Sequence, residues 1–170
     1  MADTTTAGAC SALADLLKAN RDMTVKACAA CPEDKRLYQL ADGKATPLWL
    51  LGHMANVANF VGITMGLGKD PVFPADWSAK FNPTEFGGGP ITTDAANYPA
   101  WDDLVAKYTE VMTVLADGTA ALEDSQLTGP ALGTVPPPMA AMVPNLQAAI
   151  VMHVLHDPHH RGQLALLAGS

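Results

Sequence analysis

The sequence is poor in charged residues, which make up 16% of its 170 residues, and Lys and Arg together number only ten. The formal net charge is −7, and the basic residues form no cluster along the chain. A surface that follows a phosphate backbone needs concentrated positive charge, so we expect no nucleic-acid partner. Binding to an anionic membrane surface is excluded for the same reason.

The sequence also lacks a long uninterrupted hydrophobic run. No stretch approaches the roughly eighteen consecutive apolar residues that indicate a transmembrane helix, so we expect none. Residues 1–10 show no basic start followed by an apolar run, so we expect no signal peptide. Because 49% of the residues are hydrophobic, the chain can form a full core, and we expect one domain over residues 1–170 of a cytoplasmic protein.

Cysteine is scarce and odd in number, with residues at positions 10, 28 and 31. This pattern suits a reducing compartment better than a disulfide framework. Cys28 and Cys31 form a CxxC motif. Redox motifs of this kind precede a helix, whereas here a predicted helix precedes the motif and Pro32 ends it, so we disfavour redox chemistry.

Four segments have the three- and four-residue hydrophobic spacing of an amphipathic helix. They cover approximately residues 11–30, 46–67, 99–124 and 145–168. Thr46 and Pro47 are typical of a helix N-cap followed by the first helical position. Pro158 lies inside the fourth segment, where we expect a kink or a local widening of the helix.

Two long proline-rich segments, residues 68–100 and 125–144, separate the predicted helices. Long structureless connections are uncommon in compact domains, and residues 68–100 can run back along a helix about 30 Å long. The sequence therefore predicts an all-α four-helix bundle with a long crossover loop between helices 2 and 3. Four aromatic side chains in this loop are expected to pack against the bundle: Phe73, Trp77, Phe81 and Phe86.

Four of the five histidines lie within eight residues near the C-terminus. His156 and His160 are four residues apart, so on a helix their Cβ atoms lie about 5–6 Å apart on one side. Both rings can then reach one metal ion at about 2.0–2.1 Å. His153 lies on the same side, whereas His159 points away and is expected to be a neighbour or a hydrogen-bond donor to the site.

The fifth histidine, His53, lies in the middle of the hydrophobic face of residues 46–67. That face is expected to comprise Leu50, His53, Met54, Val57, Phe60, Val61 and Thr64. A lone histidine in such a place is more often a hydrogen-bonded core residue than a ligand, and this interpretation stays open. However, facing helices in bundles often build metal sites, and three neutral histidines would leave coordination positions free for water or substrate, as in catalytic sites.

Two segments resemble the histidine motifs of the DinB/YfiT-like family of metal-dependent four-helix-bundle proteins. Residues 48–54, LWLLGHM, resemble the first motif, and residues 156–164, HDPHHRGQL, resemble the second, HxxxHRGQ. Their order, their separation and the chain length also agree, so the resemblance covers nearly the whole chain. It implies that His53, His156 and His160 are the metal ligands and that the second and third helices run parallel.

The residues around the second motif have several interpretations. His153 lies outside the motif, which leaves open a fourth ligand or a proton shuttle. Gly162 most simply allows close helix packing, and Arg161 caps the bundle surface or pairs with an acidic side chain. Gln163 is expected to orient a ligand histidine, since liganding imidazoles usually donate their other nitrogen to an acceptor. Asp157 is a weaker candidate for that role, because a helical neighbour of His156 points elsewhere.

The resemblance implies a metal-dependent enzyme that is a thiol-dependent S-transferase, an isomerase or a hydrolase. A divalent ion would acidify a low-molecular-weight thiol and hold the thiolate against an electrophile, with the crossover loop as a lid. The alternative is a non-catalytic, stress-related metal- or small-molecule-binding protein, and a third is a bundle whose histidines are incidental. We expect zinc or nickel, while iron, copper and manganese stay open. The substrate is open as well, and the resemblance allows a homodimer.

Overall fold

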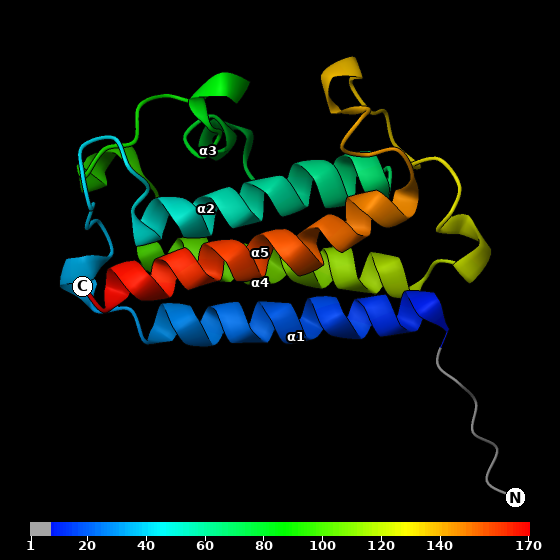
Figure 1. Ribbon diagram of the computed structural model, residues 1–170, viewed down its shortest axis with the longest axis horizontal. Coiled ribbons are helices and arrows are strands. Elements are labelled where there is room, and N and C mark those ends of the chain that lie inside the picture. Colours follow the sequence, from blue (N-terminus) through cyan, green and yellow to red (C-terminus); the bar gives the residue numbers. More distant parts are fainter. Residues whose placement is uncertain (1–7) are drawn as a thin grey trace, which may run out of the picture.

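The computed structural model describes residues 8–170, and these residues contain helices and no strand (Figure 1). The expected all-α class is confirmed. The long helices are α1 (Ala9–Ala29), α2 (Pro47–Val57) with its continuation η2 (Ala58–Gly66), α4 (Trp101–Ala120) and α5 (Leu146–Ala168). Shorter helical turns are η1 (Glu33–Lys35), α3 (Ala75–Ser78), η3 (Thr84–Phe86), η4 (Ala95–Asn97), η5 (Asp124–Gln126) and η6 (Pro137–Met139).

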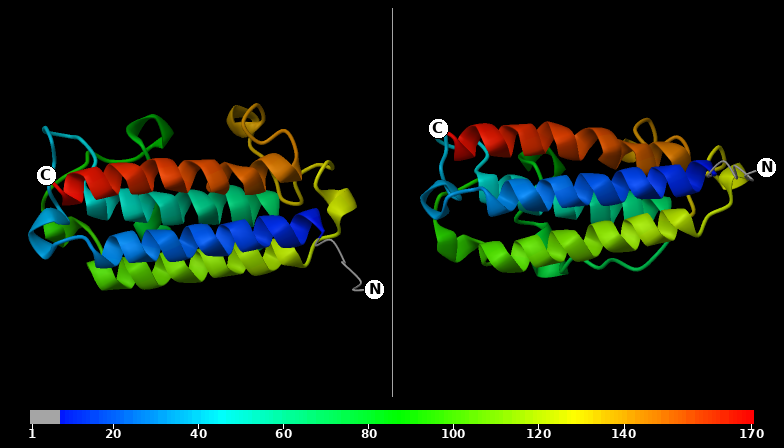
Figure 2. Two further views of the ribbon diagram at one scale, coloured as in Figure 1. Left: turned by 60° about the horizontal axis from the view of Figure 1, so that its bottom comes forward. Right: turned by 90° about the horizontal axis from the view of Figure 1, so that it is seen from below.

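Helix α2 and η2 form one rod, which together with α1, α4 and α5 makes a four-helix bundle (Figures 1 and 2). Both α2 and α4 begin at the left end of the bundle in Figure 1, whereas α1 and α5 begin at the right end. The second and third long helices therefore run parallel. Residues 67–100 carry the chain back between them, with the short helix α3 standing above α2.

The two helices that carry the histidines begin at side-chain caps. Thr46 Oγ1 accepts a hydrogen bond of 3.0 Å from the backbone N–H of Trp49, and Pro47 takes the first helical position, as expected. At the start of α5, Asn145 Oδ1 accepts a bond of 2.8 Å from the backbone N–H of Ala148. These caps satisfy otherwise unpaired N–H groups and set where each helix begins.

Widening of a helix occurs, but not where the sequence predicted it. Helix α5 remains α-helical through Pro158, so the expected local widening there is wrong. The second half of the α2 rod, Ala58–Gly66, is instead π-helical, and the N–H of Leu67 bonds the carbonyl of Gly62, five residues back. Phe60 lies in this segment and is 45% exposed, so its assignment to the buried face is also wrong. Wider turns of this kind are frequent at functional sites.

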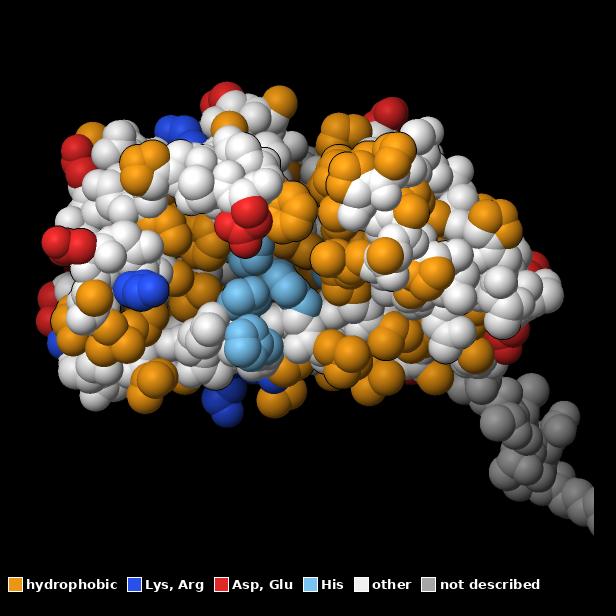
Figure 3. Space-filling model, turned by 45° about the horizontal axis from the view of Figure 1, so that its top comes forward, with side chains coloured by type: hydrophobic (Ala, Val, Ile, Leu, Met, Phe, Trp, Pro, Cys, Tyr) orange, Lys and Arg blue, Asp and Glu red, His pale blue; other side chains and the backbone are white. Residues whose placement is uncertain are grey.

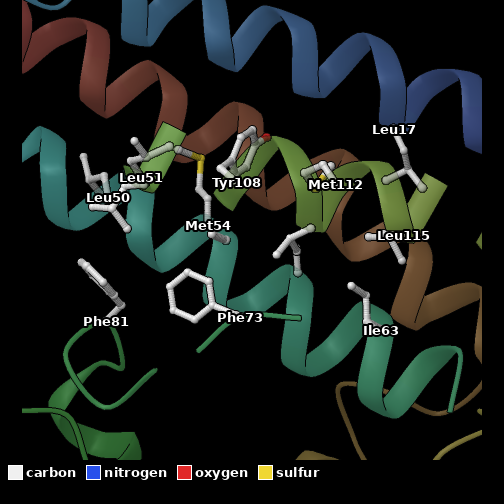
Figure 4. Packing of buried hydrophobic residues seen from close by; sticks show 14 of the residues in the cluster. Leu17, Leu50, Leu51, Met54, Ile63, Phe73, Phe81, Tyr108, Met112 and Leu115 are labelled. Carbon is white, nitrogen blue, oxygen red and sulfur yellow. The ribbon is translucent and has the colours of Figure 1, made fainter. Parts of the chain in front are cut away.

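The hydrophobic core lies between the four long helices and extends under the crossover segment (Figure 4). Its fully buried side chains include Leu17 of α1, Leu51 and Met54 of α2, and Tyr108 and Leu115 of α4. Phe73 and Phe81 of the crossover segment pack from the α2 side, as Figure 4 shows. Of the other two crossover aromatics, Trp77 is half-buried, and Phe86 is 54% exposed, so its expected packing is wrong.

Side chains of the α2 rod hold the crossover segment in place. Asn59 Oδ1 accepts hydrogen bonds from the backbone N–H groups of Val72, at 2.6 Å, and Phe73, at 2.9 Å. At Gly52 a Cβ atom would lie 2.3 Å from the Phe81 ring, so the absence of a side chain there lets the ring rest on the helix backbone. The segment is therefore a fixed part of the bundle surface near His53.

Within the described residues, Pro47–Gly66 is the helix long and apolar enough to cross a membrane, with a mean hydropathy of 1.2. In the protein, 83% of that window is buried. This is the pattern of a core helix, since a helix that is hydrophobic on most sides is buried among the other helices of the bundle.

The cysteines are free thiols and all three are buried. Burial, followed by the neighbouring Cys31, raises the pKa of the Cys28 thiol to about 12. A thiol with such a pKa stays protonated at neutral pH and is a poor nucleophile, in agreement with a structural CxxC pair.

Candidate metal centre

Three histidines from two helices meet at one point of the bundle surface. His53 comes from α2, and His156 and His160 come from α5; one ring nitrogen of each lies within 4.8 Å of the others. The Nε2 atoms of His53 and His156 are 3.3 Å apart. Two nitrogens bound to one tetrahedral ion at about 2.0–2.1 Å are themselves about 3.3–3.4 Å apart, so the spacing fits a shared ion. Figure 3 shows the histidines in pale blue at the centre of one face.

His53 is held on two sides. The indole of Trp49 stacks on its ring, with centroids 4.8 Å apart and planes within 9°. Its Nδ1 lies 2.9 Å from the carbonyl oxygen of Phe81, so Nδ1 carries the proton and donates it. The lone pair then resides on Nε2, which faces His156. Burial lowers the pKa of His53 to about 4, so at neutral pH a metal ion has no proton to displace there.

The rings of His156 and His160 are oriented like that of His53, with Nδ1 facing an oxygen acceptor. Nδ1 of His156 lies 3.2 Å from Asp157 Oδ1, and Nδ1 of His160 lies 2.7 Å from Gln163 Oε1. Burial lowers the pKa of His160 as well. With a proton on each Nδ1, all three Nε2 lone pairs are left free, and those of His53 and His156 face one another at 3.3 Å. Facing lone pairs repel unless a cation lies between them, so the residues fit a bound metal ion.

Asp157 connects the histidines to the core. It is fully buried, and its Oδ2 accepts a hydrogen bond of 2.8 Å from the hydroxyl of Tyr108. Burial, and then the charge of Asp157, raise the pKa of Tyr108 well above its usual value, so Tyr108 remains a donor. The sequence made Asp157 the weaker candidate for orienting His156, yet its carboxylate touches both Nδ1 of that ring and the tyrosine.

Neither of the two remaining histidines joins the centre. His153 is fully buried, and neither of its ring nitrogens has a hydrogen-bond partner among the residues that the structure describes. Its Nε2 packs against the backbone at Gly62, where a Cβ atom would lie only 2.9 Å away. His159 is exposed, with its ring edge-on to His160 at 5.0 Å between centroids. A fourth-ligand role for His153 therefore has no support in this arrangement.

The other residues of the second motif differ in how well the sequence predicted them. Gln163 contacts His160, one of the three converging histidines, so the contact expected for it is present. Gly162 does not allow close packing, because a Cβ atom there would meet nothing within 4 Å. Arg161 has no acidic partner within residues 8–170 and does not act as a surface cap. Its Nη1 donates to Asn20 Oδ1 at 2.6 Å and to Thr24 Oγ1 at 3.3 Å, which connects α5 to α1.

Phe81 contributes to the orientation of His53, and the sequence did not indicate this role. It acts through its backbone carbonyl, and any residue type carries that group. The sequence could indicate this contact only through two features taken together. Gly52 directly precedes His53, and the crossover segment contains an aromatic residue that can pack on that glycine.

A cavity of about 450 Å³ opens beside His53 and His156, so a molecule that enters it can reach the histidines. Comparison with curated proteins gives no match. The family model described as the DinB superfamily matches residues 16–164, a range that contains all three converging histidines and every long helix except the ends of α1 and α5. On this match and on its all-helical fold, the chain belongs to the DinB superfamily.

Proposed function

We propose that His53, His156 and His160 hold one divalent metal ion, zinc or nickel, and that the protein is a metal-dependent enzyme acting with a thiol or a water molecule as nucleophile. The observation that carries the proposal is the common orientation of the three rings. Each Nδ1 faces an oxygen acceptor, which leaves Nε2 of each ring as the free donor atom. The reaction class that this site supports is S-transfer, isomerisation or hydrolysis.

When bound, the ion would lower the pKa of a coordinated thiol or water molecule and polarise an electrophile. Three neutral ligands do not reduce the charge of the ion, and they leave at least one coordination position free. Asp157 places its carboxylate behind His156, where it stabilises positive charge on that side of the cluster. Tyr108 holds the carboxylate in this orientation from the core.

The crossover segment supports the proposal as a wall of the site. Its backbone supplies the carbonyl that orients His53, and Asn56 and Asn59 bind it to the α2 rod. Because these contacts are buried or part-buried, the segment shields one side of the histidines from water in a fixed geometry. This differs from a lid that must close after the substrate has entered.

The first test is the metal content of untagged protein. We expect about one divalent ion per chain, and loss of that ion in His53→Ala, His156→Ala and His160→Ala. The matched control is His159→Ala, which removes an exposed imidazole from the same turn of α5 without touching the converging nitrogens. Metal retained in all three ligand variants, or lost equally in the control, contradicts the site.

The second test is turnover. Metal-loaded protein is mixed with a thiol and an alkylating electrophile, or with an activated ester, and thiol consumption or ester hydrolysis is followed. We expect a rate that depends on the metal and disappears in His160→Ala. Full metal occupancy without turnover would leave the non-catalytic metal-binding function, and absence of metal would leave a bundle with incidental histidines.

A further inference from the structure

The cavity beside His53 and His156 has walls from four parts of the chain. Its volume of about 450 Å³ lies within the range of roughly 300–1,000 Å³ that is usual for small-molecule sites. The α2 rod and α5 form its floor, the crossover segment forms one wall, and the segment before α5 forms the other. Figure 3 shows hydrophobic side chains, in orange, covering the surface to the right of the histidines.

The lining contains no lysine, arginine, aspartate or glutamate, and the two histidines that reach it are the converging ones. Its side-chain polar groups are those of Asn56, Ser78 and Asn82. These groups already bond one another: Ser78 Oγ donates to Asn56 Oδ1 at 2.7 Å, and Asn56 Nδ2 donates to Asn82 Oδ1 at 2.7 Å. Away from the ion proposed at the histidines, a charged group that entered the cavity would lose its water and find no counter-charge on the lining, which is strongly unfavourable.

Hydrophobic side chains at the cavity are unusually open to solvent. Phe60, Phe86 and Met142 are each between 45% and 54% exposed, come from three different segments, and all line this cavity. Met139 and Met152 add two more flexible thioethers to the lining. Methionine adapts its shape to different apolar partners, and exposed hydrophobic surface of this kind marks a binding site.

We propose that this cavity binds the uncharged, apolar body of a substrate, an aryl or branched alkyl group, and thereby places its reactive atom at the histidines. The inference rests on the proposed metal-dependent function and narrows its substrate class to neutral, hydrophobic electrophiles. Apart from the thiolate, which the proposed ion would bind, the charged groups of a thiol co-substrate find no charged side chain in the cavity lining. Such a thiol therefore reaches the histidines from outside the cavity, and the cavity serves the second, apolar reactant.

The test uses two fluorescent probes that share one ring system and differ by one sulfonate. N-phenyl-1-naphthylamine is neutral, and 8-anilino-1-naphthalenesulfonate is its anionic counterpart. We expect the neutral probe to bind one site per chain and the anionic probe to bind at least about tenfold more weakly. Equal affinity for the two probes, or no saturable binding of the neutral one, overturns the inference.

Two variants locate the probe. Met142→Lys and Phe86→Lys each place a cation at the cavity on a solvent-exposed position, so the fold should persist. Each should weaken the neutral probe about tenfold while strengthening the anionic one. The matched control is Leu132→Lys, which changes an equally exposed residue of the same segment as Met142 that does not line the cavity. If the control changes binding as much as Met142→Lys, the probe lies elsewhere and the inference fails.

Metal content measured on the same samples separates this inference from the proposed function. Metal without saturable binding of the neutral probe overturns the apolar cavity and leaves the metal centre intact. Binding of the neutral probe that responds to Met142→Lys, in protein that holds no metal, supports the cavity and overturns the metal-dependent function.

Discussion

Replacing Gly52 by alanine places a methyl group where the ring of Phe81 lies. The new Cβ atom would be 2.3–2.5 Å from three ring carbons, and Phe81 is fully buried. To reach ordinary contact at about 3.4 Å the ring has to retreat by about 1 Å in a close-packed core. The carbonyl of the same residue accepts the bond from Nδ1 of His53, so a shift of this size also breaks that bond.

The expected effect on stability is small, and the expected effect on metal binding is large. Overpacking lowers the free energy of unfolding by about 1–3 kcal/mol, whereas replacing a helical glycine by alanine raises it by about 1 kcal/mol. The free energy of unfolding of Gly52→Ala should therefore fall by about 0–2 kcal/mol. Loss of the acceptor on His53 should weaken metal binding about 10–100-fold, as is usual when the partner of a liganding imidazole is lost.

The assay is competition for zinc against a chromogenic chelator, together with urea unfolding of the metal-free protein. Gly162→Ala is the matched control, because it makes the same substitution in α5 at a position with nothing within 4 Å. It should raise stability by up to about 1 kcal/mol and leave zinc affinity unchanged. Wild-type zinc affinity in Gly52→Ala would refute the reasoning, since it would show that the Phe81 carbonyl does not govern His53.

Three further predictions concern His153, Gln163 and Tyr108. Burial lowers the pKa of His153 to about 4, so below pH 6.5 this residue binds more protons in the unfolded chain than in the folded one. As pH falls from 6.5 to 4, His153 should therefore contribute a loss of stability of up to about 3 kcal/mol, in addition to that from His53; the difference between wild type and His153→Leu in urea unfolding across that range measures it. His153→Leu should reduce this pH dependence and, by removing an unpartnered imidazole, raise stability at pH 7 by about 1–3 kcal/mol. Gln163→Ala should weaken metal binding about tenfold by removing the acceptor of His160, measured by chelator competition, whereas Gln163→Glu should not. Tyr108→Phe should cost about 1–3 kcal/mol by leaving Asp157 Oδ2 without a donor, measured by thermal unfolding.

The sequence predicts the helices and the pairing of His156 with His160 because both depend on local spacing. The i, i+4 relation of His156 and His160 determines that they share a helix face, and caps at Thr46 and Asn145 set where each helix begins. The proline- and glycine-rich run after Leu67 gives the length that a parallel crossover needs. The family resemblance then singles out His53 as the partner of this pair.

The features that the sequence did not predict depend on contacts between segments far apart in the chain, and residue spacing does not encode such contacts. The acceptor on His53 is a backbone carbonyl, and a carbonyl has no residue-type signature. Gly62 of the π-helical η2 packs against His153, ninety-one residues further along, and local spacing gives no sign of that contact. The hydrogen bond between Arg161 and Asn20 is a further example of a contact that spacing does not encode. Asn20 interrupts the hydrophobic face of its helix, so its sequence position alone suggests a surface residue, yet it is buried.

The cavity has a floor of helices and walls of irregular chain. This division affects which parts of the cavity can change in sequence among related proteins. The histidines and their acceptors depend on α2, α5 and one carbonyl, whereas Phe86 and Met142 belong to turns that contribute little to the core. Substitutions in those turns can alter what the cavity accepts without a cost in folding. On the proposed function, proteins that share this metal centre can differ in substrate, because the irregular walls of the cavity can change more freely than its helical floor.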